Sequence, residues 1–438
     1  MKQLSILTGK LVSTVSKTAG KGSGSTWPGH IALKIDSDLI KNVLKLNPDL
    51  SIILVAGTNG KTTTTKLIQD VLVTQGKKVF RNEAGANLLN GITSTFIKHA
   101  SLNGKVNYDV AIIEVDENTL PPLLRELSTI KSKQLSIILL NLFRDQLDRY
   151  GEVNTIAKHW FESLKTLSKE TLLITNGDDP MLRFIGENSN LHSFYFGLSE
   201  KYMKKMEAPH DVDFLFCPHC ETELHYTKRS YSHMGIYICP KCHYANKSTA
   251  TFEKLPNPLF GVYNKYNINA AALLLQKTFS VSEENVKKAL IAFSPAFGRQ
   301  EKITYNGKKI FLLLSKNPTG FNQSIQAILE QDKKPNVLFL LNDRVPDGRD
   351  ISWIWDIDIE TIATKNTKLS VSGDRTYDMA LRLKYADVNL KPKQINTDLQ
   401  KGIDLALEST LGSETLYILA TYSAMLETRK ILKGRSIL

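Results

Sequence analysis

The sequence has no apolar run approaching the roughly 18 residues that a membrane-spanning helix needs. Its first residues mix Lys2, Lys10 and Lys17 with apolar residues, without the continuous apolar stretch or the cleavage site of a signal peptide. Internal repeats and low-complexity tracts are also lacking. These absences argue against a membrane-spanning, exported or repeat protein. We expect a cytoplasmic protein whose 438 residues form two or three globular domains.

Cysteine is scarce, and the four cysteines fall into one pattern, C-x₂-C-x₁₈-C-x₂-C. They are Cys217, Cys220, Cys239 and Cys242. Two such pairs can present four thiolates to zinc at about 2.3 Å, so the spacing predicts a zinc ribbon with a structural Zn²⁺ rather than disulfides or a redox-active dithiol. Four protein ligands would leave the metal no open position for catalysis. The histidines nearby are interpreted as surface residues, not ligands: His219, His225, His233 and His243.

Negative charge is in the minority, with 44 acidic residues against 56 lysines and arginines and a net charge of +12. This balance favours an acidic partner: nucleic acid, an anionic membrane surface or a phosphorylated substrate. On a helix, the apolar residues of positions 1–18 would share one face. That helix could pack on its own protein or contact a membrane surface, and both interpretations stay open.

Apolar, β-branched runs separated by helical patterns predict an α/β fold with a mostly parallel sheet. The runs lie at residues 51–56, 110–115, 136–142 and 172–175. Residues 205–255 interrupt this rhythm with a polar segment that predicts a small insertion. A second α/β unit follows, with strands expected at residues 309–314, 336–341, 368–372 and 415–420. We therefore expect a helical arm and linker (1–50), a central domain (51–301) that contains the insertion, and a C-terminal α/β domain (302–438).

A loop with glycines, a lysine and threonines joins the first predicted strand to a helix predicted over residues 62–75. Its sequence is Gly57-Thr58-Asn59-Gly60-Lys61-Thr62-Thr63. The glycines let the backbone approach phosphates, Lys61 supplies charge to the outer phosphates, and Thr62 can ligate Mg²⁺. The general G-x-x-x-x-G-K-[ST] pattern would begin at Val55, so this loop is a shorter variant. Its position between a strand and a helix predicts that the chain binds ATP.

The loop resembles the ATP loop of Mur ligases and folylpolyglutamate synthetases, which phosphorylate a carboxylate and let an amine attack the acyl phosphate. Four further blocks resemble motifs of this family in the same order. They are Glu114 at the end of a strand, Asn141-Leu142-Phe143-Arg144-Asp145-Gln146-Leu147-Asp148, Gly261-Val262-Tyr263-Asn264-Lys265-Tyr266-Asn267, and Phe297-Gly298-Arg299-Gln300-Glu301. The resemblance implies that Glu114 binds Mg²⁺, that Asn264 and Asn267 lie at the adenine, and that Arg299 meets the phosphates.

Several features depart from ordinary Mur ligases. Only 56 residues precede the loop, where those enzymes carry a UDP-binding domain, and Ser315-Lys316-Asn317-Pro318 stands where they commonly have Ala-His-Asn-Pro. The cysteine quartet is a further departure. Residues 342–356 also crowd four aspartates, two arginines and two tryptophans into one segment. Together these features resemble the MurT family, the ligase-like subunits of lipid II isoglutaminyl synthase. The resemblance implies amidation of the α-carboxylate of D-isoglutamate in the lipid II stem peptide, through an acyl phosphate.

The cysteine count also bears on the source of ammonia. A glutaminase needs a nucleophilic cysteine activated by histidine, and all four cysteines here are assigned to the metal pattern. Ammonia must then come from solution or from a second subunit. The resemblance implies a glutaminase subunit, GatD, in a heterodimer with this chain. It also implies that an aspartate of residues 342–356 orients the partner's catalytic histidine, and we favour Asp350 over Asp347 or Asp356.

Two other functions stay open. One is an ATP-dependent ligase that adds an amino acid, but the short N-terminus and the altered Ser315-Lys316 segment count against it. The other is a nucleic-acid-binding ATPase that uses the ribbon and the positive charge. It does not explain the blocks around Asn264 and Arg299. The charge is as readily explained by work beside an anionic membrane. The resemblance implies lipid II or a related precursor as substrate, and we expect a peripheral membrane contact and no nucleic acid.

Overall fold

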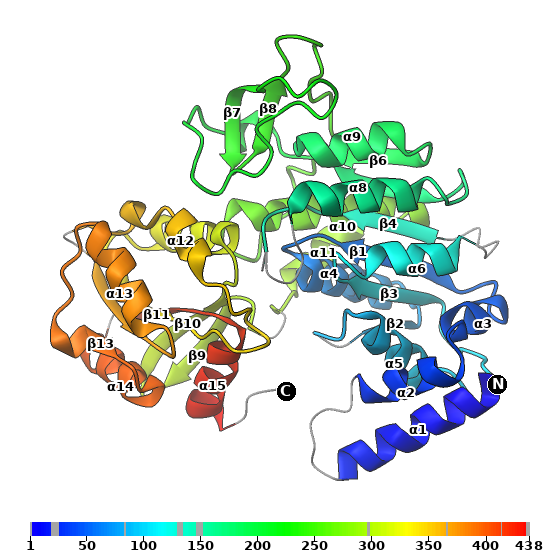
Figure 1. The fold of residues 1–438 in the computed structure, drawn as a ribbon, viewed down its shortest axis with the longest axis horizontal. Helices are drawn as coiled ribbons and strands as arrows, with labels where there is room; N and C mark the ends of the chain where they lie inside the picture. The colour runs from blue at the N-terminus through cyan, green and yellow to red at the C-terminus, as the bar shows by residue number, and fades with distance from the viewer. Residues whose placement is uncertain are drawn as a thin grey trace.

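The computed structural model describes residues 2–18, 26–82, 85–128, 135–145, 152–295, 298–364, 367–412 and 414–434. Gln146, Leu147, Asp148 and Phe297 of the motif blocks, and residues 19–25 of the expected linker, lie outside the described residues. Two layered α/β units lie side by side, with a small hairpin unit beyond one end and a helical arm at the N-terminus (Figure 1). Among the described helices, none has both the length and the apolar character that crossing a membrane requires.

The central domain is built on a six-stranded parallel sheet with strand order β2-β3-β1-β4-β5-β6. The strands are β1 (Ser51–Ala56), β2 (Val79–Arg81), β3 (Val110–Val115), β4 (Leu135–Leu139), β5 (Leu172–Asn176) and β6 (His192–Phe196). In β1, Ile52 and Leu54 enter one core, whereas Ile53 and Val55 enter the other. The strand is apolar along its whole length because helices cover both faces of the sheet.

Each face of this sheet has its own helices. One face packs against α4 (Lys61–Thr74), α10 (Val262–Phe279) and α11 (Glu283–Ile291). The other packs against α5 (Leu89–His99), α6 (Leu120–Leu127), α8 (Val153–Leu164) and α9 (Pro180–Asn188). The predicted parallel α/β sheet is confirmed.

The N-terminal arm consists of three helices, α1 (Lys2–Thr18), α2 (Trp27–Ile35) and α3 (Leu39–Lys45). The helix expected within residues 1–18 is present and packs against α2 and α5. The helical part of the expected arm continues in α2 and α3. Between these two helices, Asp36 accepts hydrogen bonds from the Asp38 backbone and the Asn42 amide, which close a short turn.

The insertion forms an antiparallel hairpin of β7 (His225–Tyr231) and β8 (Met234–Ile238). At its cysteine end it has a small core of its own, made by Cys217, Leu224, Tyr237, Cys239 and Tyr244. At the opposite end, Tyr231 and Met234 belong to the core of the central domain. The hairpin is thus anchored by its turn and carries the cysteines away from the sheet, as Figure 1 shows.

The C-terminal domain has a second six-stranded sheet, with order β13-β12-β11-β14-β10-β9. Its strands are β9 (Glu301–Tyr305), β10 (Lys308–Leu314), β11 (Asn336–Leu340), β12 (Lys368–Ser372), β13 (Ile395–Asn396) and β14 (Thr415–Ala420). Only β9 runs antiparallel, at one edge of the sheet. Four helices flank the sheet: α12 (Pro318–Gln331), α13 (Thr376–Tyr385), α14 (Leu399–Ser409) and α15 (Tyr422–Lys433). The predicted second α/β unit is confirmed.

Candidate functional site

The loop between β1 and α4 is a tight curve whose glycines cannot be replaced. Gly57 and Gly60 have φ values of 142° and 92°, which L side chains rarely adopt. A Cβ at Gly60 would lie 2.1 Å from Oδ1 of Asn267. The loop therefore packs directly on α10, and two of the sequence-predicted site residues come into contact.

Asn141 holds the loop in this shape from the end of β4. The Asn59 backbone N–H donates to Asn141 Oδ1 at 2.8 Å, and the Asn141 amide donates back to the Asn59 carbonyl at 2.9 Å. The Thr58 hydroxyl accepts from the Phe143 backbone N–H at 2.9 Å. The motif block that begins at Asn141 thus holds the backbone of the loop, which the sequence could not reveal.

Lys61, the first residue of α4, is buried, and its ammonium group points back over the loop. Nζ donates to the Thr58 carbonyl at 3.2 Å and lies 3.5 Å from Oε2 of Glu117. Glu117 is buried like the lysine and was missed by sequence reasoning. Its position two residues beyond β3 was the available signal, because polar residues that follow buried strands gather at the same edge of a parallel sheet.

Thr62 and Glu114 form an oxygen pair beside the loop. The Thr62 hydroxyl donates to Oε2 of Glu114 at 2.8 Å, and both side chains are buried. The Glu114 backbone is fixed on both sides by the amide of Asn82, which accepts from its N–H and donates to its carbonyl, each at 2.8 Å. A hydroxyl and a carboxylate at this spacing are the donor types that Mg²⁺ takes at nucleotide sites, so the residues present fit the ion.

A cross-domain ion pair closes the same cluster. Lys316 of the C-terminal domain pairs with the buried Asp145 of the central domain. Burial raises the pKa of Asp145, and Lys316 opposes that rise. Burial also acts against the charge of Lys316, but the carboxylates of Asp145 and Glu117 raise its pKa above the ordinary value. The lysine is therefore charged where the two domains meet.

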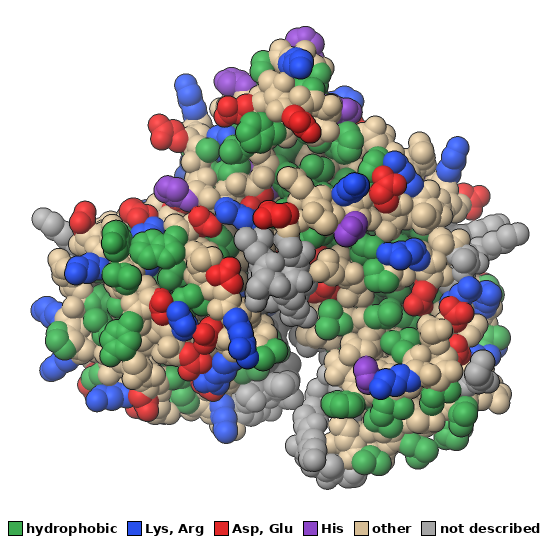
Figure 2. All heavy atoms as spheres, in the orientation of Figure 1, with side chains coloured by type: hydrophobic (Ala, Val, Ile, Leu, Met, Phe, Trp, Pro, Cys, Tyr) green, Lys and Arg blue, Asp and Glu red, His purple; other side chains and the backbone are tan. Residues whose placement is uncertain are grey.

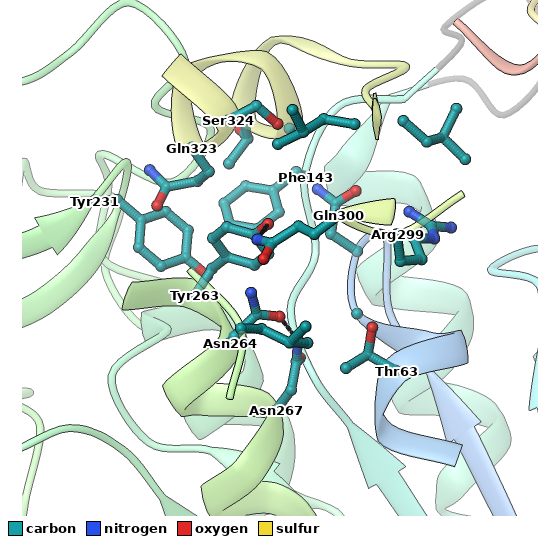
Figure 3. A pocket seen from close by; sticks show the side chains of 17 residues that line it. Thr63, Phe143, Tyr231, Tyr263, Asn264, Asn267, Arg299, Gln300, Gln323 and Ser324 are labelled. Carbon is teal, nitrogen blue, oxygen red and sulfur yellow. Dashed lines mark hydrogen bonds between the residues drawn. The ribbon is translucent and has the colours of Figure 1, made fainter. Parts of the chain in front are cut away.

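A pocket opens beside the loop and has walls from both domains (Figure 3). The loop and α4 contribute Asn59, Gly60 and Thr63, α10 contributes Asn264 and Asn267, and α12 contributes Gln323 and Ser324. The Asn267 amide donates to Asn264 Oδ1 at 3.3 Å, and the Asn264 amide donates to the Phe260 carbonyl at 2.6 Å. The two asparagines are therefore held in fixed orientations at one wall.

Arg299 lines the same pocket, next to a buried glutamine that sequence reasoning missed. The Gln300 amide donates to the Tyr263 hydroxyl and to the Phe260 carbonyl, both at 2.7 Å, and accepts from the Phe260 N–H. With φ of 56°, Gln300 has an uncommon backbone conformation that these bonds hold in place. The turn that carries Arg299 is thus fixed from one side.

Aromatic rings form another part of the pocket wall. Phe143, Tyr231 and Tyr263 surround this part of the pocket in Figure 3. Tyr231 comes from the ribbon hairpin, and its ring centroid lies 6.0 Å from that of Phe143. The insertion therefore contributes directly to the pocket, which nothing in the sequence pattern indicated.

The four cysteines meet at the far end of the hairpin. All their Sγ atoms lie within 4.8 Å of one another, with Cys217 and Cys242 3.5 Å apart and Cys220 and Cys239 also 3.5 Å apart. Sulfurs around a tetrahedral zinc with bonds of about 2.3 Å are about 3.8 Å apart, so the donor set and spacing fit zinc.

The interpretation of the neighbouring histidines is correct for three of them and wrong for His233. His219, His225 and His243 are exposed, whereas His233 is fully buried. Its Nε2 lies 3.3 Å from Oδ2 of Asp179. The hairpin turn carries His233 into the central domain, because the ribbon is anchored by that turn.

The three candidate aspartates of residues 342–356 have different environments. Asp347 is buried and accepts from the Ser423 N–H at 2.8 Å. Asp356 forms an ion pair of 3.1 Å with Arg144 of the central domain. Asp350 is partly exposed and accepts from the Ser352 N–H within its own segment, at 2.8 Å. It does not line the pocket.

Comparison with known proteins agrees with this geometry. The family profile of the Mur ligase middle domain matches residues 55–275, and that of the MurT ligase C-terminal domain matches residues 314–425. The lipid II isoglutaminyl synthase (glutamine-hydrolyzing) subunit MurT of Streptococcus pneumoniae is 30% identical over 95% of this chain and 94% of that protein. The Staphylococcus aureus subunit of the same name is also 30% identical, over 90% of this chain and 89% of that protein.

A solved structure shows the same fold at lower identity. A pseudomurein peptide ligase type C from Methanothermus fervidus has a TM-score of 0.66 and 20% identity, over 90% of this chain and 81% of that one. Fold, site and family profiles together define an ATP-dependent ligase of the Mur ligase class. Within that class, the chain belongs to the MurT family.

Proposed function

We propose that this chain uses ATP to amidate the α-carboxylate of D-isoglutamate in the stem peptide of lipid II, which yields D-isoglutamine. The relatives aligned along nearly the whole chain are named as subunits of an enzyme with that activity. One observation carries the proposal for this molecule. One buried cluster beside the pocket brings together side chains from both domains. It contains Lys61 of the glycine-rich loop, the acidic residues Glu117 and Asp145, and Lys316 of the C-terminal domain.

The reaction would consist of two transfers. A carboxylate oxygen of the substrate attacks the γ-phosphorus of ATP, the bond from that phosphorus to its bridging oxygen breaks, and ADP leaves. Ammonia then attacks the carbonyl carbon of the acyl phosphate, loses a proton and expels phosphate. Lys61 and Arg299 would offset the charge that develops on the transferred phosphoryl group.

ATP would lie along the loop and in the adjoining pocket. The loop residues Gly57, Thr58, Asn59, Gly60, Lys61, Thr62 and Thr63 would hold the phosphates, with Asn264 and Asn267 at the adenine. Thr62 and Glu114 would hold Mg²⁺, which neutralises phosphate charge when it is bound. The contact between Gly60 and Asn267 supports this arrangement, because it joins the phosphate end of the pocket to the base end.

In this proposal residues 51–301 form the ATP-binding domain, with the ribbon at 205–255. Cys217, Cys220, Cys239 and Cys242 would hold a structural Zn²⁺, as their sulfur spacing supports. The arm would comprise residues 1–50, and the second domain residues 302–438. The reaction would take place in the cytoplasm at the inner face of the plasma membrane, where a lipid-linked precursor is presented.

Ammonia would come from a glutaminase subunit of the GatD type, bound as a heterodimer. The four cysteines are clustered for a metal, so none is available as the glutaminase nucleophile. We assign to Asp350 the task of orienting the partner's catalytic histidine. Asp347 is buried and Asp356 is paired with Arg144 of the other domain, whereas Asp350 is partly exposed and accepts from its own segment, which supports that choice. Exposed aromatic side chains nearby, Trp355 and Tyr385, have ring centroids 5.4 Å apart and would suit a protein interface.

The decisive experiment is an assay of the purified chain with lipid II, ATP and Mg²⁺, with products identified by mass. We expect ammonium to support replacement of one hydroxyl by an amino group without a partner, and glutamine to do so only when the glutaminase subunit is added. Addition of a whole amino acid would instead identify the alternative ligase. ATP turnover that depends on DNA or RNA would identify the nucleic-acid-binding ATPase.

A further inference from the structure

Helix α1 has two apolar faces, of which only one is covered by the protein. On the inner face, Ser5 and Ile6 are fully buried, and a Cβ at Gly9 would lie 2.8 Å from the Ile97 side chain of α5. On the outer face, the exposed fractions are 57% for Leu4, 43% for Leu7, 59% for Leu11 and 63% for Val15. The helix therefore packs on its own protein and also presents apolar side chains to the outside.

The exposed side chains form one row along the helix. At about 100° per residue, the four positions fall within about 80° of arc and extend over about 16 Å. Trp27, the first residue of α2, adds an aromatic side chain that is 61% exposed, and α2 packs against α1. Figure 2 shows hydrophobic side chains gathered over α1 at the lower edge of the molecule. Single exposed apolar residues need no explanation, whereas a continuous row marks an interaction surface.

The charge of α1 and α2 is of one sign. Residues 2–35 contain five lysines and no acidic residue. Lys10 is partly exposed and lies about one sixth of a turn beyond Leu7, which forms one edge of the row. An apolar row with a lysine beside it and tryptophan nearby is the pattern of a helix that lies in the interface of a bilayer with anionic lipids. A symmetric contact with a second copy would bring the lysines of two arms together, which like-charge repulsion disfavours.

We propose that the outer face of α1, formed by Leu4, Leu7, Leu11 and Val15, docks this protein on the surface of an anionic lipid bilayer. This inference rests on the proposed function, because a lipid-linked acceptor gives the docking its purpose.

Helix α5 is one connection between the arm and the site. The Gly29 N–H of α2 donates to the Ser94 hydroxyl of α5 at 2.7 Å. Just before α5, a Cβ at Gly85 would lie 3.6 Å from the hydroxyl of Tyr422, which belongs to the C-terminal domain. Docking through α1 would therefore hold the junction of the two domains near the membrane surface, where a lipid-linked stem peptide is anchored.

Flotation of the full chain with vesicles tests the docking without any substrate. We expect binding to vesicles that contain phosphatidylglycerol and little binding to pure phosphatidylcholine. Leu7→Gln/Leu11→Gln should weaken binding more than tenfold, and Lys10→Gln should weaken it about fivefold at low salt, because a lysine near such a surface contributes about that much. A matched control is Val73→Gln/Leu102→Gln, which changes two similarly exposed apolar residues outside the arm. Equal flotation of the control and the α1 variant, or no flotation of the unaltered chain, would overturn the docking surface.

A second measurement separates this inference from the proposed function. The α1 variant should keep ATP-dependent amidation of lipid II in detergent but lose most of it when lipid II is embedded in vesicles. Loss in detergent as well would contradict a docking role for the row. An unaltered chain that floats but amidates neither form would uphold docking and contradict the proposed function. A dimer in gel filtration that dissociates in Leu7→Gln/Leu11→Gln would identify a second copy as the occupant.

Discussion

Lys316 of the C-terminal domain forms a buried ion pair with Asp145 of the central domain. The residue before Asp145, Arg144, forms a second cross-domain pair with Asp356. Asp145 also responds electrostatically to Glu117 and Lys61, which lie at the loop. The contact between the two domains is therefore coupled to the charge balance beside the proposed phosphate site.

The first prediction concerns this ion pair. Lys316→Met should lower the free energy of unfolding by about 3 kcal/mol, because it leaves a buried carboxylate without its partner. Lys316→Met/Asp145→Leu should recover most of that stability, since no charge is then left unpaired. Neither variant should amidate efficiently if the pair aligns the domains. Urea denaturation and the amidation assay check both points, and full activity in the double variant would contradict the role.

Removal of the loop lysine should abolish chemistry and preserve the fold. We expect Lys61→Ala to reduce ATP turnover by about 100-fold or more, because a fixed charge at the transferred phosphoryl group is lost. The measurement is ADP release, with circular dichroism to confirm folding. Lys66→Ala is a suitable control, because Lys66 lies about one and a half turns further along α4 and pairs with Asp70 at the surface. Normal turnover in Lys61→Ala would refute ATP binding at this loop.

The ribbon should influence nucleotide binding through Tyr231. Tyr231→Ala should raise the Kd for ATP about tenfold, the magnitude expected when a base loses an aromatic neighbour, whereas Tyr231→Phe should keep the affinity. Zinc removal by a chelator, or Cys242→Ser, should weaken ATP binding in the same direction, because the cysteine end of the hairpin that carries Tyr231 loses its cross-link. Calorimetric titration measures both effects. Unchanged ATP affinity after complete zinc removal would contradict an influence of the zinc-bound ribbon on the pocket.

A pH dependence of stability should arise from Asp178 at the base of the hairpin. Burial raises the pKa of Asp178 to about 7, against hydrogen bonds from the Leu198 N–H and the Tyr266 hydroxyl. The folded state then binds more protons than the unfolded state between pH of about 4 and about 7, so this group makes the protein less stable as pH rises through that window.

Asp178→Asn keeps a neutral side chain that can accept the same two hydrogen bonds. We expect this variant to be as stable as the unaltered chain near pH 5, and more stable by up to about 4 kcal/mol near pH 8. Urea denaturation at both pH values provides the measurement. An identical pH profile in the two proteins would show that Asp178 is ionised throughout.

The partly exposed Asp350 should be needed only for the glutamine-dependent reaction. Asp350→Asn should abolish glutamine-dependent amidation in the complex and leave ammonium-dependent amidation intact. Asp347→Asn should act differently, through stability. The buried Asp347 carboxylate accepts hydrogen bonds from Ser423, and weakening these bonds should lower the free energy of unfolding by about 1–2 kcal/mol. Glutamine-dependent activity that survives in Asp350→Asn would refute the assignment.

Local sequence was sufficient for much of the fold. The runs at residues 51–56, 110–115, 368–372 and 415–420 are the strands β1, β3, β12 and β14 with the same bounds. Strands covered on both faces must be apolar along their whole length, and that signal does not depend on distant residues. The short strands β2 and β13 were not predicted, because two or three residues carry no periodic pattern. The edge strand β6 was also missed, since its residues are mostly only partly buried.

The sequence by itself determined the loop, the cysteine quartet and the order of the motifs, because each depends on residues close together in the chain. The tertiary structure alone decided which distant side chains meet. It brought Glu117 and Lys316 to the loop, carried Tyr231 from the insertion into the pocket, and buried His233. It also distinguished Asp350 from Asp347, since hydrogen bonding and burial depend on neighbours far away in the chain. Such contacts arise from packing between elements, which no local pattern encodes.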